Sequence, residues 1–175
     1  METLDAICSR RSIRSYTGEI ITKEQENTLL MAANASPVGL GQYGSVHLTI
    51  IKDKAILQEI ETTYGRLTGR SNIHPLYGAP ELIIASVKMN SPENIAYANA
   101  GVVIHNMSLA ATELGVGHVY ISGVLFAVNS APVLRAKLGI PDRFVPAAAL
   151  AVGVTRESYE KREIPMHRIS TNIIE

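Results

Sequence analysis

Residues 94–117 read "NIAYANAGVVIHNMSLAATELGVG", and the way this stretch is buried constrains how the rest of the chain can fold. It carries one charged residue, Glu113, and many small ones. Its length is close to the ~20 residues that a membrane-spanning helix needs. Polar side chains such as Asn99 and His105 make a bilayer span costly. We therefore expect a helix that is buried on nearly all sides of a water-soluble core. The small residues that would let a second backbone approach this helix closely are Ala98, Ala100 and Gly101.

The rest of the chain mixes helical and strand patterns without the regular alternation of a parallel α/β fold. Thr22 and Gln25 form a capping box that predicts a helix, and Pro37 ends it. Ser130 is the expected N-cap of a later helix. This mixture, with no repeats and no linker, predicts a single α+β domain over residues 1–175. Further helices are predicted just before the arginines near residue 10, over 54–66 and over 130–139, and strands over 45–53, 79–88, 118–123 and 145–154.

Composition and charge narrow the classes of function. The chain has 16 basic and 16 acidic residues, so its net charge is zero. We expect no nucleic-acid partner and no membrane partner from this balance. The single cysteine, Cys8, excludes an intramolecular disulfide and a cysteine-rich metal site. The five histidines show no metal-ligand spacing. The first residues lack the apolar run of a secretory signal, which predicts a cytoplasmic protein.

Gly39, Gly41 and Gly44 spell G-x-G-x-x-G, the pattern of a dinucleotide-binding turn. That turn needs a strand before it and a helix after it, so that the helix N-terminus meets the pyrophosphate. Here the predicted helix precedes the glycines and the predicted strand follows them, so a Rossmann-type site fits poorly. Two other interpretations remain open: an ordinary glycine-rich turn, or a loop whose backbone lies against a flat ligand.

A basic cluster follows the first predicted helix and consists of Arg10, Arg11, Ser12 and Arg14. One interpretation is local, because cations at a helix C-terminus are mildly stabilised by the helix dipole. The other is an anion site, because forked guanidinium donors match phosphate oxygens and Ser12 adds a hydroxyl donor. In a chain with no net charge, any anion site must be a local cluster, and this one is the best candidate.

Five segments, taken in order, resemble the signature segments of one known family. They are "RRSIRSY" (10–16), "ASPVGLGQYGSVHLTII" (35–51), "YGAPELIIAS" (77–86), "AGVVIHNMSLAATELGVGHVYISG" (100–123) and "LGIPDRFVPAAALAVGV" (138–154). The family is that of the flavin-dependent nitroreductases, and the resemblance covers nearly the whole chain. It implies a nitroreductase-like fold, with a central, mostly antiparallel sheet flanked by helices. It also implies an intertwined homodimer in which the C-terminal tail embraces the partner.

The resemblance implies a cofactor and a reaction as well. One FMN is expected in each active site, at the interface of the dimer. NADH or NADPH would deliver a hydride there, and a small electron-poor acceptor, such as a nitroaromatic or a quinone, would take the electrons in the same place. A shared place implies ping-pong kinetics. No side chain is expected to act as a catalytic acid or base, because the flavin carries the hydride chemistry.

The resemblance assigns the phosphate end of the cofactor to the two ends of the chain. Arg10, Arg11 and Ser12 are implied to hold the ribityl-phosphate arm. Lys161 and Arg162 resemble the late basic pair that closes on the phosphate. The polar tail would then be ordered by the partner subunit, which fits its inability to bury much surface by itself.

The ring of the cofactor is assigned to other segments. Arg14 is implied to lie near the pyrimidine edge, where a fixed cation favours the reduced flavin. Asn72 matches a position that hydrogen-bonds the flavin. The remaining implied contacts are Pro37, Val38 and Gly39 from the partner subunit, and Ile121, Ser122 and Gly123 on the other face of the ring.

The chain departs from the family pattern around this pocket. Val38 replaces a serine, and the sequence contains no tryptophan, so the usual Trp-Ile-Gly segment reads Tyr120-Ile121-Ser122. FMN binding stays the expectation, while the substrate profile is left open. A non-catalytic flavin-binding or sensor protein on the same fold is the alternative function. Tyr120 fits either a core aromatic or a contact beside the ring, and its position in a strand favours the core.

Overall fold

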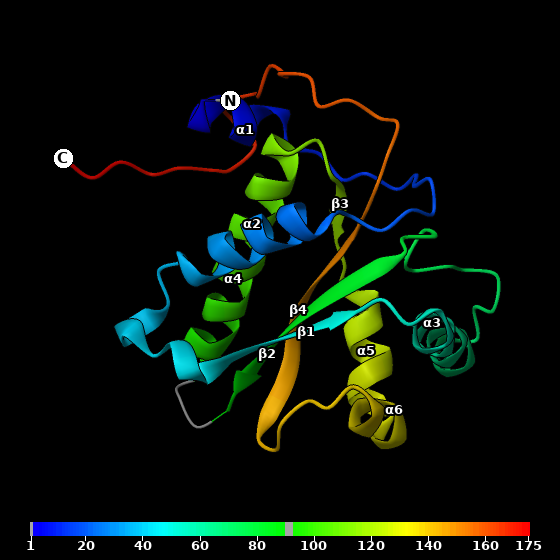
Figure 1. Cartoon of the computed structure of the whole chain (residues 1–175). Coiled ribbons are helices and arrows are strands. Elements are labelled where there is room, and N and C mark those ends of the chain that lie inside the picture. The colour runs from blue at the N-terminus through cyan, green and yellow to red at the C-terminus, as the bar shows by residue number, and fades with distance from the viewer. Residues whose placement is uncertain (1, 90–92) are drawn as a thin grey trace.

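A four-stranded sheet lies between two layers of helices in the computed structural model, which describes residues 2–89 and 93–175 (Figure 1). The strands follow the order β1-β2-β4-β3, and each neighbouring pair is antiparallel. The predicted α+β fold with an antiparallel sheet is therefore confirmed. The strands are β1 (Val46–Ile51), β2 (Glu81–Lys88), β3 (Gly117–Tyr120) and β4 (Phe144–Gly153).

Each face of the sheet carries its own helices and its own apolar core (Figure 1). The central strands β2 and β4 are buried on both faces, and this explains why their sequences are continuous apolar runs. One face is covered by α1 (Thr3–Ser9), α2 (Lys23–Asn34) and α4 (Glu93–Glu113), the other by α3 (Lys54–Thr68), α5 (Gly123–Ser130) and α6 (Pro132–Lys137).

Local hydrogen bonds explain where two of the helices begin. The Thr22 hydroxyl accepts from the Gln25 backbone N–H at 3.2 Å, and the Gln25 side chain accepts from the Thr22 N–H at 2.9 Å. The predicted capping box of α2 is therefore confirmed. At α3, Asp53 Oδ1 accepts from the Ala55 and Ile56 N–H groups at 2.8 and 3.1 Å.

The segment before β4 differs from its prediction. Residues 123–130 form a helix, α5, that the sequence analysis did not predict. Ser130 ends this helix and is not the N-cap of the next, since α6 begins at Pro132 with Ala131 as its N-cap. Gly139 follows α6 with a φ of 61°, the left-handed conformation expected after a helix end.

Helix α4 is less buried than predicted. Its inner face packs into the core through fully buried residues such as Ala100, Ile104 and Met107. The opposite face is open, because Ala98 and His105 are exposed and Gly101 is only half-buried. The expectation of burial on nearly all sides is therefore wrong within this chain. No helix among residues 2–89 and 93–175 is long and apolar enough to cross a bilayer.

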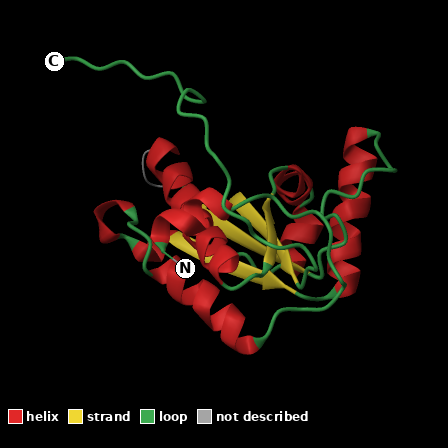
Figure 2. Cartoon of the chain, turned by 90° about the horizontal axis from the view of Figure 1, so that it is seen from above, coloured by secondary structure: helices red, strands yellow, loops and turns green. Residues whose placement is uncertain are grey.

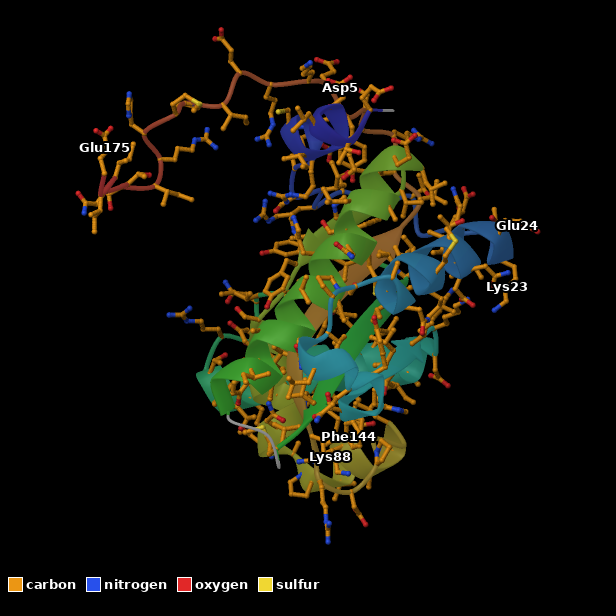
Figure 3. The ribbon with its side chains drawn as sticks, turned by 90° about the vertical axis from the view of Figure 1, so that its left-hand side faces the viewer. Asp5, Lys23, Glu24, Lys88, Phe144 and Glu175 are labelled. Carbon is orange, nitrogen blue, oxygen red and sulfur yellow. The ribbon has the colours of Figure 1, made fainter. Side chains whose placement is uncertain are left out.

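The chain after β4 forms neither helix nor strand. It returns along the molecule to α1 and then runs out into solvent, away from the layered body (Figures 1 and 2). Figure 3 shows its end at Glu175, beyond the helix that carries Asp5. The apolar residues that this tail exposes are Ile164, Met166, Ile169, Ile173 and Ile174.

Candidate functional site

Residues 8–16 and 155–162 run side by side, and we call this contact the terminal seam. The Thr155 hydroxyl donates to the Ser15 carbonyl at 2.9 Å. The Arg162 guanidinium donates to the carbonyls of Cys8 at 3.1 Å and Arg10 at 2.5 Å, at the end of α1. The Arg162 side chain from the tail therefore lies against the backbone of the segment that carries Arg10 and Arg11.

Salt bridges also join the tail to the N-terminal part of the chain at the terminal seam. Arg11 pairs with Glu157 at 2.9 Å and donates to the Ser158 carbonyl at 3.1 Å. Lys161 pairs with Asp5 of α1 at 2.5 Å, and this hydrogen bond raises the pKa of the lysine. At the end of α1, the backbone N–H of the C-cap residue Arg10 donates to the Ala6 carbonyl, and Arg162 from the tail donates to the carbonyls of Cys8 and Arg10.

Tyr159 anchors the tail to β3 from within the seam. Its hydroxyl lies 2.7 Å from Nδ1 of His118 and donates to the Val116 carbonyl at 2.8 Å. The two rings are stacked, with their centroids 5.5 Å apart. Burial, together with the nearby charge of Arg10, lowers the pKa of His118 to about 4. Partial burial is the main reason that the pKa of His105 is lowered as well, and the charge of Arg10 adds to it.

A cavity of about 260 Å³ opens beside the seam, and we call it the Arg14 cavity. Arg14 comes from the segment after α1, and its Cζ atom lies 5.4 Å from the ring centroid of Tyr77. Gly123 begins α5 here, and a Cβ on it would lie 3.2 Å from the Tyr64 ring, so glycine lets that ring approach. The lining residues are Arg14, Tyr64, Ile73, Pro75, Tyr77, Val119, Tyr120, Ile121, Ser122 and Gly123.

Four predicted ring contacts therefore meet in one cavity, namely Arg14, Ile121, Ser122 and Gly123. Asn72 precedes the lining residue Ile73 in the α3–β2 loop, but it is exposed and does not line the cavity itself. Tyr120 is 51% exposed and lines the cavity, so the preference for a core position was wrong.

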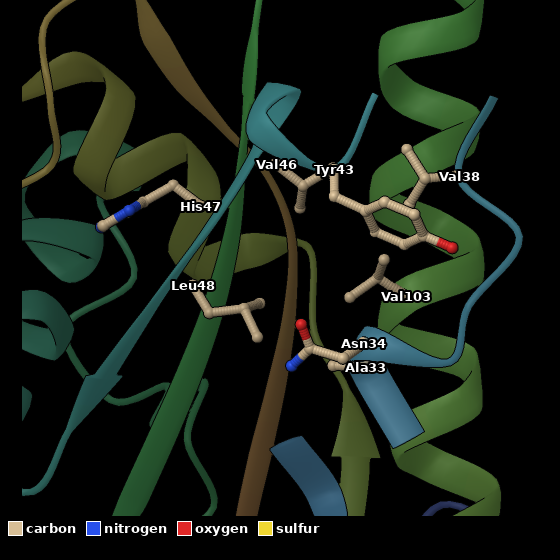
Figure 4. Close-up of a pocket in the computed structure, with 8 residues that line it drawn as sticks. All are labelled: Ala33, Asn34, Val38, Tyr43, Val46, His47, Leu48 and Val103. Carbon is tan, nitrogen blue, oxygen red and sulfur yellow. The ribbon is translucent and has the colours of Figure 1, made fainter. Parts of the chain in front are cut away.

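The predicted partner-side residues lie elsewhere. Val38 lines a second cavity, of about 230 Å³, between α2, β1 and α4 (Figure 4). The Gly39 N–H donates to Asn99 Oδ1 of α4 at 2.9 Å, and Pro37 is exposed. His47 of β1 also belongs to the lining of this Val38 cavity, although its ring points away from the space (Figure 4). Within one chain, Pro37, Val38 and Gly39 thus form a group separate from the Arg14 cavity.

The model of the nitroreductase family matches residues 7–154, a range that contains both cavities and the N-terminal side of the seam. The chain belongs to the nitroreductase family. The predicted family is therefore confirmed.

Solved and curated nitroreductase relatives agree with this. The crystal structure of an FMN-bound nitroreductase from Bacteroides fragilis is 26% identical, with a TM-score of 0.82, over 99% of this chain and 100% of that one. The FMN reductase (NADPH) of Bacillus subtilis is 28% identical over 86% of this chain, which spans 65% of that relative. The NADPH-flavin oxidoreductase of Vibrio harveyi is 27% identical over 94% of this chain and 71% of its own length.

Several residues of this nitroreductase site could not be found from the sequence. Tyr64 and Tyr77 line the Arg14 cavity from α3 and its following loop. Tyr64 stands in no recognisable motif, and Tyr77 opens the segment 77–86 that resembles the family, but nothing in that segment marked it as a cavity residue. Glu157 and Tyr159 bind the seam from the tail, where the only signal was their nearness to the basic pair 161–162. The glycine pattern at 39–44 forms two short 3₁₀ turns, Gly39–Gly41 and Tyr43–Ser45, directly before β1. The order of elements that a Rossmann-type site needs is therefore missing here.

Proposed function

We propose that this nitroreductase is an FMN-dependent oxidoreductase that takes a hydride from NADH or NADPH and passes the electrons to a small electron-poor acceptor, such as a nitroaromatic or a quinone. The observation that carries the proposal is the Arg14 cavity, in which a guanidinium and the Ser122–Gly123 backbone line one space beside the terminal seam. The names of the Bacillus and Vibrio relatives and the FMN bound to the Bacteroides protein support it.

The described residues fit both ends of FMN. The seam brings the guanidinium groups of Arg11 and Arg162 to the segment that carries Arg10, and guanidinium groups are donors that suit phosphate oxygens. The Arg14 cavity offers a cation and apolar or aromatic walls, which suit a flat ring with a polar edge. FMN supplies the hydride chemistry when it is bound, and the chain binds, orients and electrostatically tunes it.

Each seam residue would make a different contribution to binding the phosphate. Among the described residues no carboxylate pairs with Arg10, so its charge is available to the phosphate, with the Ser12 hydroxyl as a further donor. Arg11 is shared with Glu157. Lys161 and Arg162 add positive charge from the tail while they hold α1.

The cavity residues act on the ring. Arg14 favours negative charge at the pyrimidine edge of the flavin and therefore favours the reduced form. Ile121, Ser122 and Gly123 line the cavity and would cover one face of the ring, and the exposed Asn72 would hydrogen-bond it from the neighbouring loop. Nicotinamide and acceptor use the remaining open face in turn, so the kinetics are ping-pong.

A homodimer completes the site. Pro37, Val38 and Gly39 lie apart from the Arg14 cavity of their own chain, so they reach a flavin only across a subunit interface. The open face of α4 and the exposed apolar residues of the tail are surfaces that a second copy would bury. The strand β1 is an edge strand and offers the partner's tail an unpaired backbone. The single domain over 1–175 and the cytoplasmic location stay predictions.

An absorption spectrum of the purified protein tests the proposal, followed by anaerobic titration with NADH and with NADPH. We expect flavin bands that either nicotinamide bleaches and that an added quinone or nitroaromatic restores. Parallel lines in double-reciprocal plots would support ping-pong turnover. A colourless protein that takes up no added FMN contradicts the proposal. Bleaching without any turnover of acceptors favours the non-catalytic alternative.

A further inference from the structure

Tyr77 has a backbone conformation that its side chain disfavours. Its φ is 55° and that of Gly78 is 76°, and the Ala79 N–H donates to the Leu76 carbonyl at 3.0 Å. The four residues thus form a tight turn with positive φ at both central positions. Such turns favour Asn, Asp or Gly at the first central position, because a Cβ is crowded there. The chain places a tyrosine at this position instead, and the contact that its ring makes explains why a tyrosine stands here.

The contact that the ring makes is with Arg14. The Arg14 Cζ atom lies 5.4 Å from the ring centroid, within the range of a cation–π interaction. Both residues line the Arg14 cavity with Ser122 and Gly123. No carboxylate of the described residues pairs with Arg14, which is itself exposed. The aromatic ring is therefore what restrains a long and otherwise mobile side chain at the edge of the cavity.

We propose that Tyr77 is a positioning residue that holds the Arg14 guanidinium beside the flavin, so that its charge stabilises reduced FMN more than oxidised FMN. The inference rests on the proposed function. A cation that is fixed before the charge develops is more effective than one that must be ordered at that moment. The hydrogen-bonded turn sets the backbone conformation of Tyr77, and the ring then restrains the arginine. The backbone strain at Tyr77 is accordingly local to the site, where strained residues tend to cluster.

The midpoint potential of bound FMN, measured by dye equilibration, tests this directly, and the dissociation constant of FMN is measured beside it. The potential reports the ratio of the affinities for reduced and oxidised FMN. Tyr77→Phe keeps the ring and should change this ratio by less than a factor of about two. Tyr77→Leu removes the ring and should lower that ratio about fivefold, the upper range for an exposed cation–π contact, which is about 20 mV for a two-electron couple. Tyr77→Gly should lower it equally while it folds at least as well as the wild type, because glycine suits the positive φ.

A double-mutant cycle separates positioning from a general structural effect. In an Arg14→Ala background, Tyr77→Leu should leave the potential unchanged, because the group that it positions is gone. A further fall in that background overturns the proposal, and so does a wild-type potential in Tyr77→Leu or Tyr77→Gly. If Tyr77→Leu fails to fold, Tyr77→Gly gives the answer. A wild-type protein that binds no FMN refutes the proposed function, whereas FMN binding with an unshifted potential in the variants refutes only the role of Tyr77.

Discussion

Lowering the pH from 7 to 4 should destabilise the fold through His118. This side chain is 1% exposed, and its Nε2 atom is buried with no hydrogen-bond partner among the described residues. Its Nδ1 atom lies 3.1 Å from the Val116 carbonyl and 2.7 Å from the Tyr159 hydroxyl. Burial is the main reason that its pKa falls to about 4, and the charge of Arg10 adds to it. The folded protein therefore holds this histidine neutral.

The sign and the size of the effect follow from proton linkage. In the unfolded chain His118 takes up a proton below pH ~6.5, whereas in the folded chain it does so only below about 4. Between these values the unfolded state binds more protons, so stability is lost as the pH falls. At about 1.4 kcal/mol per pH unit, this window of about 2.5 pH units gives an upper limit of roughly 3.5 kcal/mol in the free energy of unfolding. Below it the contribution of His118 is constant.

Urea unfolding followed by circular dichroism at pH 7, 6, 5 and 4.5 measures this loss. The comparison is between the wild type and His118→Gln, because other groups titrate equally in both. Two of these other groups are Glu26, whose pKa is lowered by hydrogen bonds from Lys23 and Lys52, and Glu81, whose pKa is raised by burial. We expect His118→Gln to be less stable at pH 7 but to lose less stability on acidification. Equal slopes for wild type and His118→Gln would refute the reasoning.

Three further perturbations test packing, the tail anchor and the dimer. Gly153→Ala would place a Cβ 2.5 Å from Pro80 Cδ, and overpacking of about 1–3 kcal/mol should lower the calorimetric melting temperature by several degrees. Gly44→Ala, with open space around its Cβ, should be nearly neutral, and equal melting temperatures would contradict the packing at β4. Tyr159→Phe removes the hydroxyl between His118 and Val116 and should reduce the free energy of unfolding by about 1 kcal/mol; an unchanged urea midpoint would count against that anchor. Ile169→Asp combined with Ile173→Asp places charges on the exposed tail and should convert the proposed dimer into a folded monomer in sedimentation velocity. An intact dimer would contradict the proposal that the tail packs on the partner subunit.

The secondary structure was predictable where its signals are local. The capping box of Thr22 and Gln25 joins residues three apart, so it can be found in the sequence before any fold is known. The helix α5 was missed because its apolar residues show no clear period, and because Ser130 and Pro132 suggested a later start. The open face of α4 was missed because the small and apolar residues along this helix do not indicate which face the rest of the chain covers.

The candidate site was predictable mainly through the family resemblance. The hydrogen bond from Arg162 to the Arg10 carbonyl joins residues 152 positions apart, a pairing that no local pattern determines. The salt bridge of Arg11 with Glu157 depends on the path of the tail in the same way. Tyr77 could not have been found, because tyrosine gives no sequence signal for the positive φ that brings its ring to Arg14.

The central claim is that arginines from both ends of the chain bind the phosphate of one flavin, and it is tested by comparing FMN with riboflavin, which lacks that phosphate. Flavin fluorescence gives both dissociation constants for the wild type and for Arg10→Ala combined with Arg162→Ala. Since hydrogen bonds to charged groups contribute about 1.5–3 kcal/mol each, the account predicts that FMN binding weakens at least about tenfold while riboflavin binding stays the same. An unchanged FMN affinity, or an equal loss for both flavins, would contradict it.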